Sequence, residues 1–187
     1  PDGSTLWAIL QSPLLQDGGV DEKNERIGLN IRILEVSLKD GATRELVYPL
    51  EKAGHGVNEI LAMSDRELLV LERDGKAGTD TKFRSLFMID IAAATDVSSI
   101  PSLGPRRLPD GVQPVRKRRW LDLLDPAFGL AGPGMPEKIE GLTLGPPLAD
   151  GRRTLIVTTD NDLRAENPSW FWVFALGARS PAADAGH

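Results

Sequence analysis

The sequence contains no cysteine and almost no histidine. Of its 187 residues two are histidines, and one of these is the last residue of the chain. Without cysteine the chain forms no disulfide and no thiolate zinc site, and its redox compartment stays undecided. With His55 the only histidine ahead of the C-terminus, histidine-based metal sites and catalytic triads are also disfavoured.

Long apolar runs and an excess of positive charge are missing as well. No run approaches the roughly 20 apolar residues that span a bilayer, so we expect no membrane span. The 27 acidic and 22 basic residues give a net charge of −5, which argues against nucleic acid as the main partner. With 41% hydrophobic residues the chain is long enough to bury a sizeable core.

Helical periodicity is also absent, and strand patterns take its place. No segment keeps a 3.6-residue apolar face for more than about three turns. Short apolar or alternating runs lie instead between turn residues, as strands do, and 14 prolines and 19 glycines fit many short strands. The predicted strands are residues 6–10, 30–38, 45–50, 59–64, 67–73, 85–91, 119–124, 140–145, 154–159 and 171–176. The fold class is therefore all-β.

A repeated hairpin predicts a β-propeller. Residues 3–13, 65–75 and 151–162 share a polar turn, an apolar strand and a polar tip. Further hairpins lie between them, so each unit holds about four strands, as a propeller blade does; the alternative, a β-sandwich, does not need the same hairpin three times. Because a turn and a strand open the chain at once, we expect an incomplete propeller of about half the blades that begins mid-blade. Its boundaries are residues 1–176, followed by a disordered tail at 177–187.

Carboxylates gather at the same end of two of these hairpins. Hairpin geometry places Glu140 almost opposite Asp160, and Glu59 opposite Glu72 within one residue. Opposed carboxylates are unfavourable unless a cation or an arginine compensates them. Arg73 is one candidate, and a bound Ca²⁺, which takes six to eight oxygen ligands, is the other.

A solvated turn is the alternative for these acids. Aspartate and asparagine hydrogen-bond their own backbone and tolerate left-handed conformations, so the segments 72–75 and 160–162 also fit ordinary strand-exit turns. Strand starts do not favour glutamate on propensity grounds, which makes Glu59 and Glu140 stronger site candidates.

Several motifs resemble one known family. They are PDGSTLWAILQSPL (1–14), YPLEKAGHGVNEI (48–60), NEILAMSDRELLVLERDG (58–75), IDIAAATDVS (89–98), KRRWLDLLD (117–125), KIEGLTLG (138–145) and LIVTTDND (155–162). Together they resemble the phytase-like family, the domain called "esterase-like activity of phytase", from Pro1 to about Leu176. The chain departs from the family pattern at Ile60, where a Glu-Gly pair is usual, and its first blade lacks the glutamate strand.

The resemblance implies a propeller with phosphoesterase or phosphodiesterase activity and export to the periplasm or the extracellular space. The acidic motif positions and their neighbours here are Glu59, Glu72, Arg73, Asp74, Glu140, Asp160, Asn161 and Asp162. On this basis we expect calcium-dependent hydrolysis of a small-molecule phosphate ester, in which Arg73 steadies the negative charge. The predicted calcium ligands are Glu59, Glu72, Glu140, Asp160, Asn161 and Asp162.

Two further signals leave alternatives open. His55, on a glycine-flanked loop, is either a general acid or phosphate contact, or a plain turn histidine. The basic run RKRRW (116–120) is either an anion patch or an outer strand with a solvent-facing polar side. For the whole chain, a non-catalytic propeller that binds a ligand or partner is the alternative, since no clear general base exists beyond His55; a calcium-dependent lactonase-type propeller is another.

Overall fold

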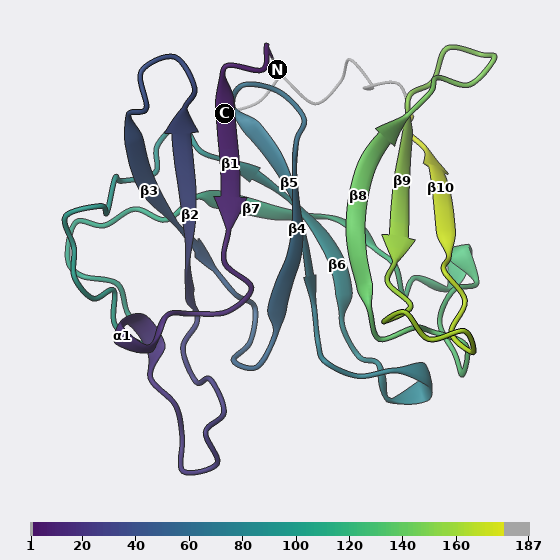
Figure 1. Ribbon diagram of the computed structural model, residues 1–187, viewed down its shortest axis with the longest axis horizontal. Coiled ribbons are helices and arrows are strands. Elements are labelled where there is room, and N and C mark those ends of the chain that lie inside the picture. Colours follow the sequence, from purple (N-terminus) through teal and green to yellow (C-terminus); the bar gives the residue numbers. More distant parts are fainter. Residues whose placement is uncertain (1, 178–187) are drawn as a thin grey trace, which may run out of the picture. The chain divides into compact units, whose positions relative to one another are not determined.

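The computed structural model describes residues 2–177, and all ten predicted strands are present there with slightly shifted ends (Figure 1). The strands are β1 (Thr5–Ile9), β2 (Asn30–Ser37), β3 (Thr43–Pro49), β4 (Gly56–Ala62), β5 (Glu67–Arg73), β6 (Arg84–Asp90), β7 (Arg116–Asp122), β8 (Ile139–Gly145), β9 (Thr154–Thr159) and β10 (Phe171–Ala175). Within residues 2–177, helix is limited to α1 (Leu15–Gly18) and two 3₁₀ turns, Gly78–Asp80 and Pro126–Phe128. The predicted all-β class is confirmed.

The strands form three antiparallel sheets, ordered β1-β2-β3, β4-β5-β6-β7 and β10-β9-β8. The chain divides after residue 137 into two compact units, the first with two sheets and the second with the third sheet. Three separate sheets do not establish a closed ring, so the propeller stays a prediction. Of the predicted tail at 177–187, only residue 177 lies within the described part of the chain.

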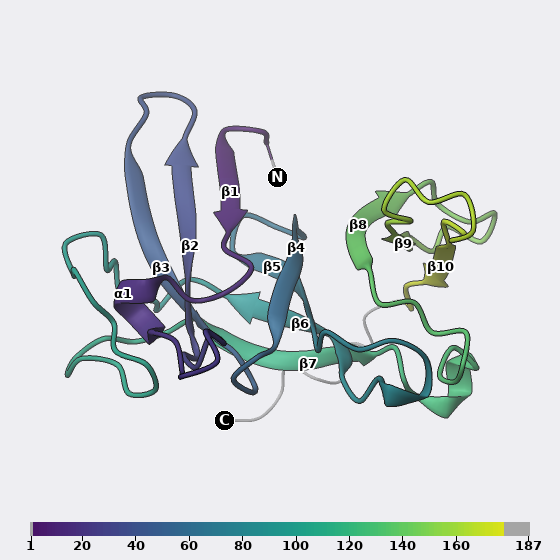
Figure 2. The ribbon, with the colours of Figure 1, turned by 60° about the horizontal axis from the view of Figure 1, so that its bottom comes forward.

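In the first unit the two sheets share one core. Strand alternation sends every second side chain of each sheet inward, where the largest fully buried ones include Ile31 and Tyr48 from one sheet and Leu68 and Ile89 from the other. Each buried side chain of this size contributes about 1.5–3 kcal/mol. β1 and β4 lie side by side where the sheets meet (Figures 1 and 2).

The long connection between β6 and β7 covers the outer edge of β3. Val97 N donates to Glu45 O (2.8 Å) and Val115 N donates to Val47 O (2.9 Å), so the connection pairs with that edge. Val97, Val47 and Leu103 are buried together beneath it. An edge strand that is covered in this way is protected from pairing with other chains.

Two β-bulges change the predicted register of the acidic hairpins. In β4–β5 the register shifts between Val57 and Glu59, so Val57 pairs with Glu72, and Glu59 pairs with Leu71. Asn58 is the extra residue. The predicted Glu59–Glu72 pairing holds within the one residue allowed for it, and the offset arises because a bulge adds one residue to one strand only.

The second hairpin has its bulge at the same place. In β8–β9 the register shifts between Ile139 and Gly141, and Glu140 is the extra residue. Asp160 lies beyond β9, where its N–H donates to Lys138 O (2.9 Å). The predicted Glu140–Asp160 pairing is therefore wrong. By position along the strand Glu140 corresponds to Asn58, not to Glu59.

No helix in residues 2–177 has the length and apolar character needed to cross a bilayer.

Candidate functional site

A pocket of about 160 Å³ opens in the first unit, beside the start of β4 and the end of β5. Residues of four chain segments line it: Gln11, Ser12, Glu25, Arg26, Gly54, His55, Gly56, Asn58, Arg73 and Gly75. His55 and Arg73, the two predicted catalytic residues, are both among them. The structure thus brings these two side chains to one cavity, although 18 positions separate them in the sequence.

A tight turn before β4 places His55. The N–H of His55 donates to Lys52 O (3.1 Å), and Gly54 has φ +84°, a left-handed conformation that glycine adopts without strain. The imidazole packs on the Phe83 ring, with 4.4 Å between the centroids. The turn and this ring contact together hold the imidazole at the pocket wall.

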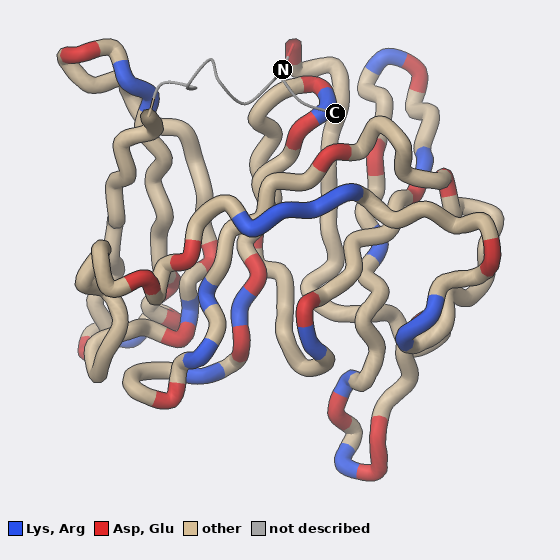
Figure 3. Tube along the Cα trace, turned by 180° about the vertical axis from the view of Figure 1, so that it is seen from behind, with Lys and Arg blue, Asp and Glu red and all other residues tan. Residues whose placement is uncertain are grey.

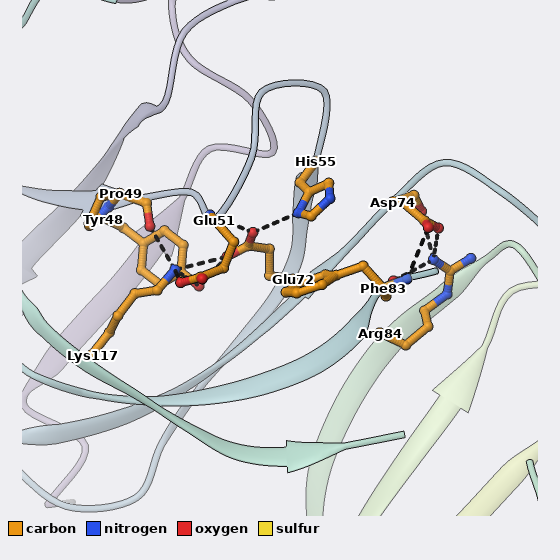
Figure 4. Close-up of polar contacts among 9 residues, drawn as sticks. All are labelled: Tyr48, Pro49, Glu51, His55, Glu72, Asp74, Phe83, Arg84 and Lys117. Carbon is orange, nitrogen blue, oxygen red and sulfur yellow. Dashed lines mark hydrogen bonds and ion pairs between the residues drawn. The ribbon is translucent and has the colours of Figure 1, made fainter. Parts of the chain in front are cut away.

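Glu72, near the end of β5, anchors the imidazole from below (Figure 4). Its side chain is fully buried, with 0% exposed. Oε1 accepts hydrogen bonds from His55 Nδ1 (3.0 Å) and from the N–H of Glu51 (2.9 Å). Oε2 accepts from the Tyr48 hydroxyl (2.7 Å) and from Lys117 Nζ (3.0 Å). Two donors on each oxygen occupy the acceptor sites of the carboxylate.

These partners keep Glu72 ionised. Burial alone raises the pKa of the Glu72 carboxyl, but the His55 hydrogen bond, the Lys117 charge and the other donors outweigh burial and leave this pKa below its usual value. Burial and the adjacent Glu72 charge raise the pKa of Tyr48 far above its usual range, so Tyr48 stays a proton donor.

The charge of Glu72 also decides the tautomer of His55. An ionised carboxylate only accepts hydrogen bonds, so the proton in the 3.0 Å contact belongs to His55 Nδ1. In the neutral ring Nε2 is then the basic nitrogen. A buried carboxylate that orients an imidazole at a pocket is an arrangement suited to general acid–base chemistry.

Glu72 is not placed as the predicted metal ligand. Both carboxylate oxygens are buried and engaged by protein donors, which leaves no direction open to an ion. Glu59 is half-buried, and its Oε1 accepts the N–H of Ile60 (2.8 Å). The sequence selected Glu72 as a candidate ligand, but it did not indicate that the side chain lies on the inward face of β5.

Asp74 stabilises the β5–β6 connection. Its carboxylate accepts the N–H groups of Lys82 (2.7 Å) and Phe83 (3.0 Å) and forms an ion pair with the buried Arg84. Burial raises the pKa of Asp74, but the hydrogen bonds and the Arg84 charge outweigh it and lower the pKa overall. Asp74 therefore holds the loop that carries Phe83, the ring beneath His55.

The other predicted ligands belong to the second unit, where they form a turn. Asp160 accepts the N–H of Asp162 (2.9 Å), and Asn161 accepts the N–H of Leu163 (3.0 Å). Asp162 has φ +55° and lies 3.7 Å from Lys138 Nζ. This is the geometry of the solvated-turn alternative for these residues. Glu140, half-buried, occupies the bulge of β8.

No three His, Asp or Glu side chains within residues 2–177 form a group that could hold a metal ion. The predicted calcium site stays a prediction.

Sequence reasoning missed Tyr48, Lys117, Asn58 and Arg26. For Lys117 a signal existed, since strict alternation along β7 places Lys117 opposite the core residue Ile89 and Arg116 on the other face. All four residues of the run 116–119 are basic, so their charge alone does not show which of them face inward. Arg26 could not be found, because only the fold of the 12–26 loop brings it to the pocket.

Comparison with known proteins gives one match. The model of the Phytase-like family, described as esterase-like activity of phytase, matches residues 1–163. No curated protein and no solved structure matches the chain significantly. The match includes the whole pocket and the strands β1 to β9.

Proposed function

The chain belongs to the phytase-like family, whose description is esterase-like activity of phytase, and from this premise we propose that it hydrolyses a small-molecule phosphate ester in the pocket beside His55. One observation carries the proposal. The fully buried Glu72 holds His55 through Nδ1 at 3.0 Å, while the same imidazole lines a pocket that also contains Arg73.

In the proposed reaction His55 acts as general base and then as general acid. Nε2 takes a proton from a water molecule as the water oxygen forms a bond to phosphorus, and the imidazolium then gives that proton to the departing alkoxide as the phosphorus–oxygen bond breaks. Glu72 keeps the imidazole in the required tautomer and stabilises its transient positive charge.

Two arginines supply the charge that a phosphate requires. Arg73 Nη1 donates to Asp74 O (3.2 Å), and Arg26 Nη1 donates to Pro13 O (2.8 Å), so both guanidinium groups are held at the pocket by backbone contacts. Guanidinium groups match phosphate oxygens in geometry and charge. This favours an anionic ester over a neutral ester or a lactone.

Calcium, the ion that the opposed carboxylates of the sequence predict, has no step in this reaction. Glu72 has no free acceptor site, and Asp160 and Asn161 hydrogen-bond their own turn. Within residues 2–177, no group of three His, Asp or Glu side chains is placed to hold a metal ion. The lactonase-type alternative depends on a calcium site, and the proposal does not include it.

A propeller architecture and an exported protein remain part of the proposal. The sequential order of the four strands β4 to β7 and the bulges shared by β4 and β8 support repeated blades. The phytase-like membership supports an exported location only by analogy with the family.

The test is an assay of the purified chain on bis-p-nitrophenyl phosphate, p-nitrophenyl phosphate and phytate. We expect His55→Gln and Arg73→Met each to lower kcat/KM by a factor of about 100 or more. Arg107→Met, which alters an exposed arginine in the β6–β7 connection, is the matched control and leaves turnover unchanged. Turnover that persists in His55→Gln contradicts the proposal. Binding of inorganic phosphate without turnover of any ester favours the alternative of a non-catalytic binding module.

A further inference from the structure

Lys117 differs from the other basic residues of its strand. The run 116–119 forms a continuous stretch of positive charge along β7 (Figure 3). Arg118 and Arg119 have 60% and 49% of their side chains exposed, whereas Lys117 has 10%. The Lys117 side chain instead points into the interior of the first unit, where it contacts the same Glu72 carboxylate as His55 (Figure 4).

The Lys117 ammonium group has acceptors on several sides. Nζ lies 2.7 Å from Pro49 O, 2.9 Å from Glu51 Oε1 and 3.0 Å from Glu72 Oε2. It also lies over two aromatic rings, 4.4 Å from the Tyr48 centroid and 4.1 Å from the Phe87 centroid. The hydrogen bonds and the two cation–π contacts together fix the position of the Lys117 ammonium group.

The two buried charges of this cluster balance each other. Glu72 contributes one negative charge and Lys117 one positive charge, while Glu51 is more than a third exposed and is screened by solvent. An unneutralised buried carboxylate would bind His55 as an imidazolium, because an opposite charge within about 4–6 Å favours the protonated ring. An imidazolium has no lone pair on Nε2 and cannot take a proton from water.

We infer that Lys117 is a positioning residue, which neutralises Glu72 and so keeps the His55 ring uncharged with Nε2 available as a base. The charged and titratable groups around the ring are Glu25, Arg26, Tyr48, Glu51, Glu72, Arg73, Lys117 and Arg119, from the β1–β2 connection, β3, the β3–β4 connection, β5 and β7. Among them Lys117 is the buried cation in direct contact with the carboxylate that holds His55. The role in catalysis rests on the proposed function, but the effect on His55 protonation does not.

The test is an NMR titration of the His55 ring proton in the full chain, with the His187 signal as internal reference. In Lys117→Met we expect the His55 titration midpoint to rise by about one pH unit, a tenfold tighter hold on the proton. Lys117→Arg keeps the charge and should return the midpoint towards that of the wild type. Arg118→Met, a change on the same strand at an exposed position, is the matched control and should not move it.

A midpoint that stays unchanged or falls in Lys117→Met overturns the inference. If this variant does not fold, the double variant Glu72→Gln/Lys117→Met removes both charges and leaves none buried alone. If Lys117 neutralises Glu72, the His55 titration midpoint of this double variant should lie within about half a pH unit of the wild type. A fall of more than about one unit would show that Lys117 does not neutralise Glu72.

The pH dependence of ester turnover is a second measurement, and it separates this inference from the proposed function. If the hydrolase proposal holds, the acid limb of the kcat/KM profile should move upward in Lys117→Met by the same shift as the NMR midpoint. If no ester is hydrolysed, the NMR titration still decides the role of Lys117.

Discussion

His55 Nδ1 lies 3.0 Å from Oε1 of Glu72, a carboxylate with no exposed surface. The histidine comes from the turn before β4 and the glutamate from the end of β5, so one antiparallel hairpin brings them together. The same carboxylate contacts β3 through Tyr48 and β7 through Lys117. One buried side chain therefore links β3, β5, β7 and the turn that carries His55.

Acid should destabilise the chain through Glu72. The folded-state pKa of Glu72 lies below its unfolded value, so its stabilising effect is full above about pH 4.5 and is lost as pH falls through the folded pKa. We expect the urea midpoint to fall between about pH 6 and pH 3, and to fall less steeply in Glu72→Gln. Glu166→Gln, at an exposed position, should keep the wild-type slope. Equal slopes for Glu72→Gln and the wild type would contradict this assignment.

Arg84 should be essential for the stability of the first unit. Its side chain is fully buried and pairs with Asp74, and its Nη1 also donates to Asp74 O (2.8 Å). Arg84→Met leaves the aspartate without its ion pair, and we expect a loss of about 3–5 kcal/mol in the free energy of unfolding, measured in urea. Arg118→Met is the control and should cost at most about 0.5 kcal/mol. A loss below about 1 kcal/mol in Arg84→Met would show that the pair is dispensable.

Alanine variants of two glycines can separate the effect of backbone strain on stability from its effect on ester turnover. Gly54 and Gly111 have φ +84° and +85°, and a Cβ at either position meets no atom within 4 Å. Alanine at either position should therefore cost about 1 kcal/mol of stability. Only Gly54→Ala alters the turn that holds His55, so we expect about a tenfold loss of phosphate ester turnover in that variant alone. Equal turnover in both variants would show that the turn does not position the ring.

Calcium binding can be tested apart from catalysis. The calcium hypothesis predicts that about 1 mM calcium raises the melting temperature, and that Glu140→Gln removes the rise, because an ion that binds only the folded chain stabilises it. Thermal unfolding with and without EGTA measures the effect. Glu166→Gln, in the same unit, should retain the calcium response. If the wild type shows no rise, calcium is not a ligand of this chain.

The strands were predictable because their signal is local. Alternation and turn residues within each segment determined all ten, including the exact limits of 67–73 and 154–159. The register at the acidic ends was not predictable. The extra residues Asn58 and Glu140 break simple cross-strand counting, and nothing in a single strand indicates a bulge.

For the site, the sequence selected His55, Arg73 and Glu72 as candidates, but it did not indicate that Glu72 contacts His55. Glu72 was expected to face an ion, and the structure turns it towards the core. Lys117 was hidden in a run of exposed cations. Both differences concern the direction of a side chain near the end of a strand, where a bulge or a neighbouring sheet decides which face it lies on.

By itself the sequence determined the all-β class, the hairpins and the family, since these follow from patterns within short segments and from motifs in order. Only the tertiary structure decided that Tyr48, His55 and Lys117 meet on one carboxylate. Tyr48 and Lys117 lie 24 and 45 residues from Glu72 along the chain, and the two sheets must pack before the three donors converge. Because Glu72 is buried, protein donors take the place of water around its carboxylate. The carboxylate stays ionised and holds the imidazole of His55.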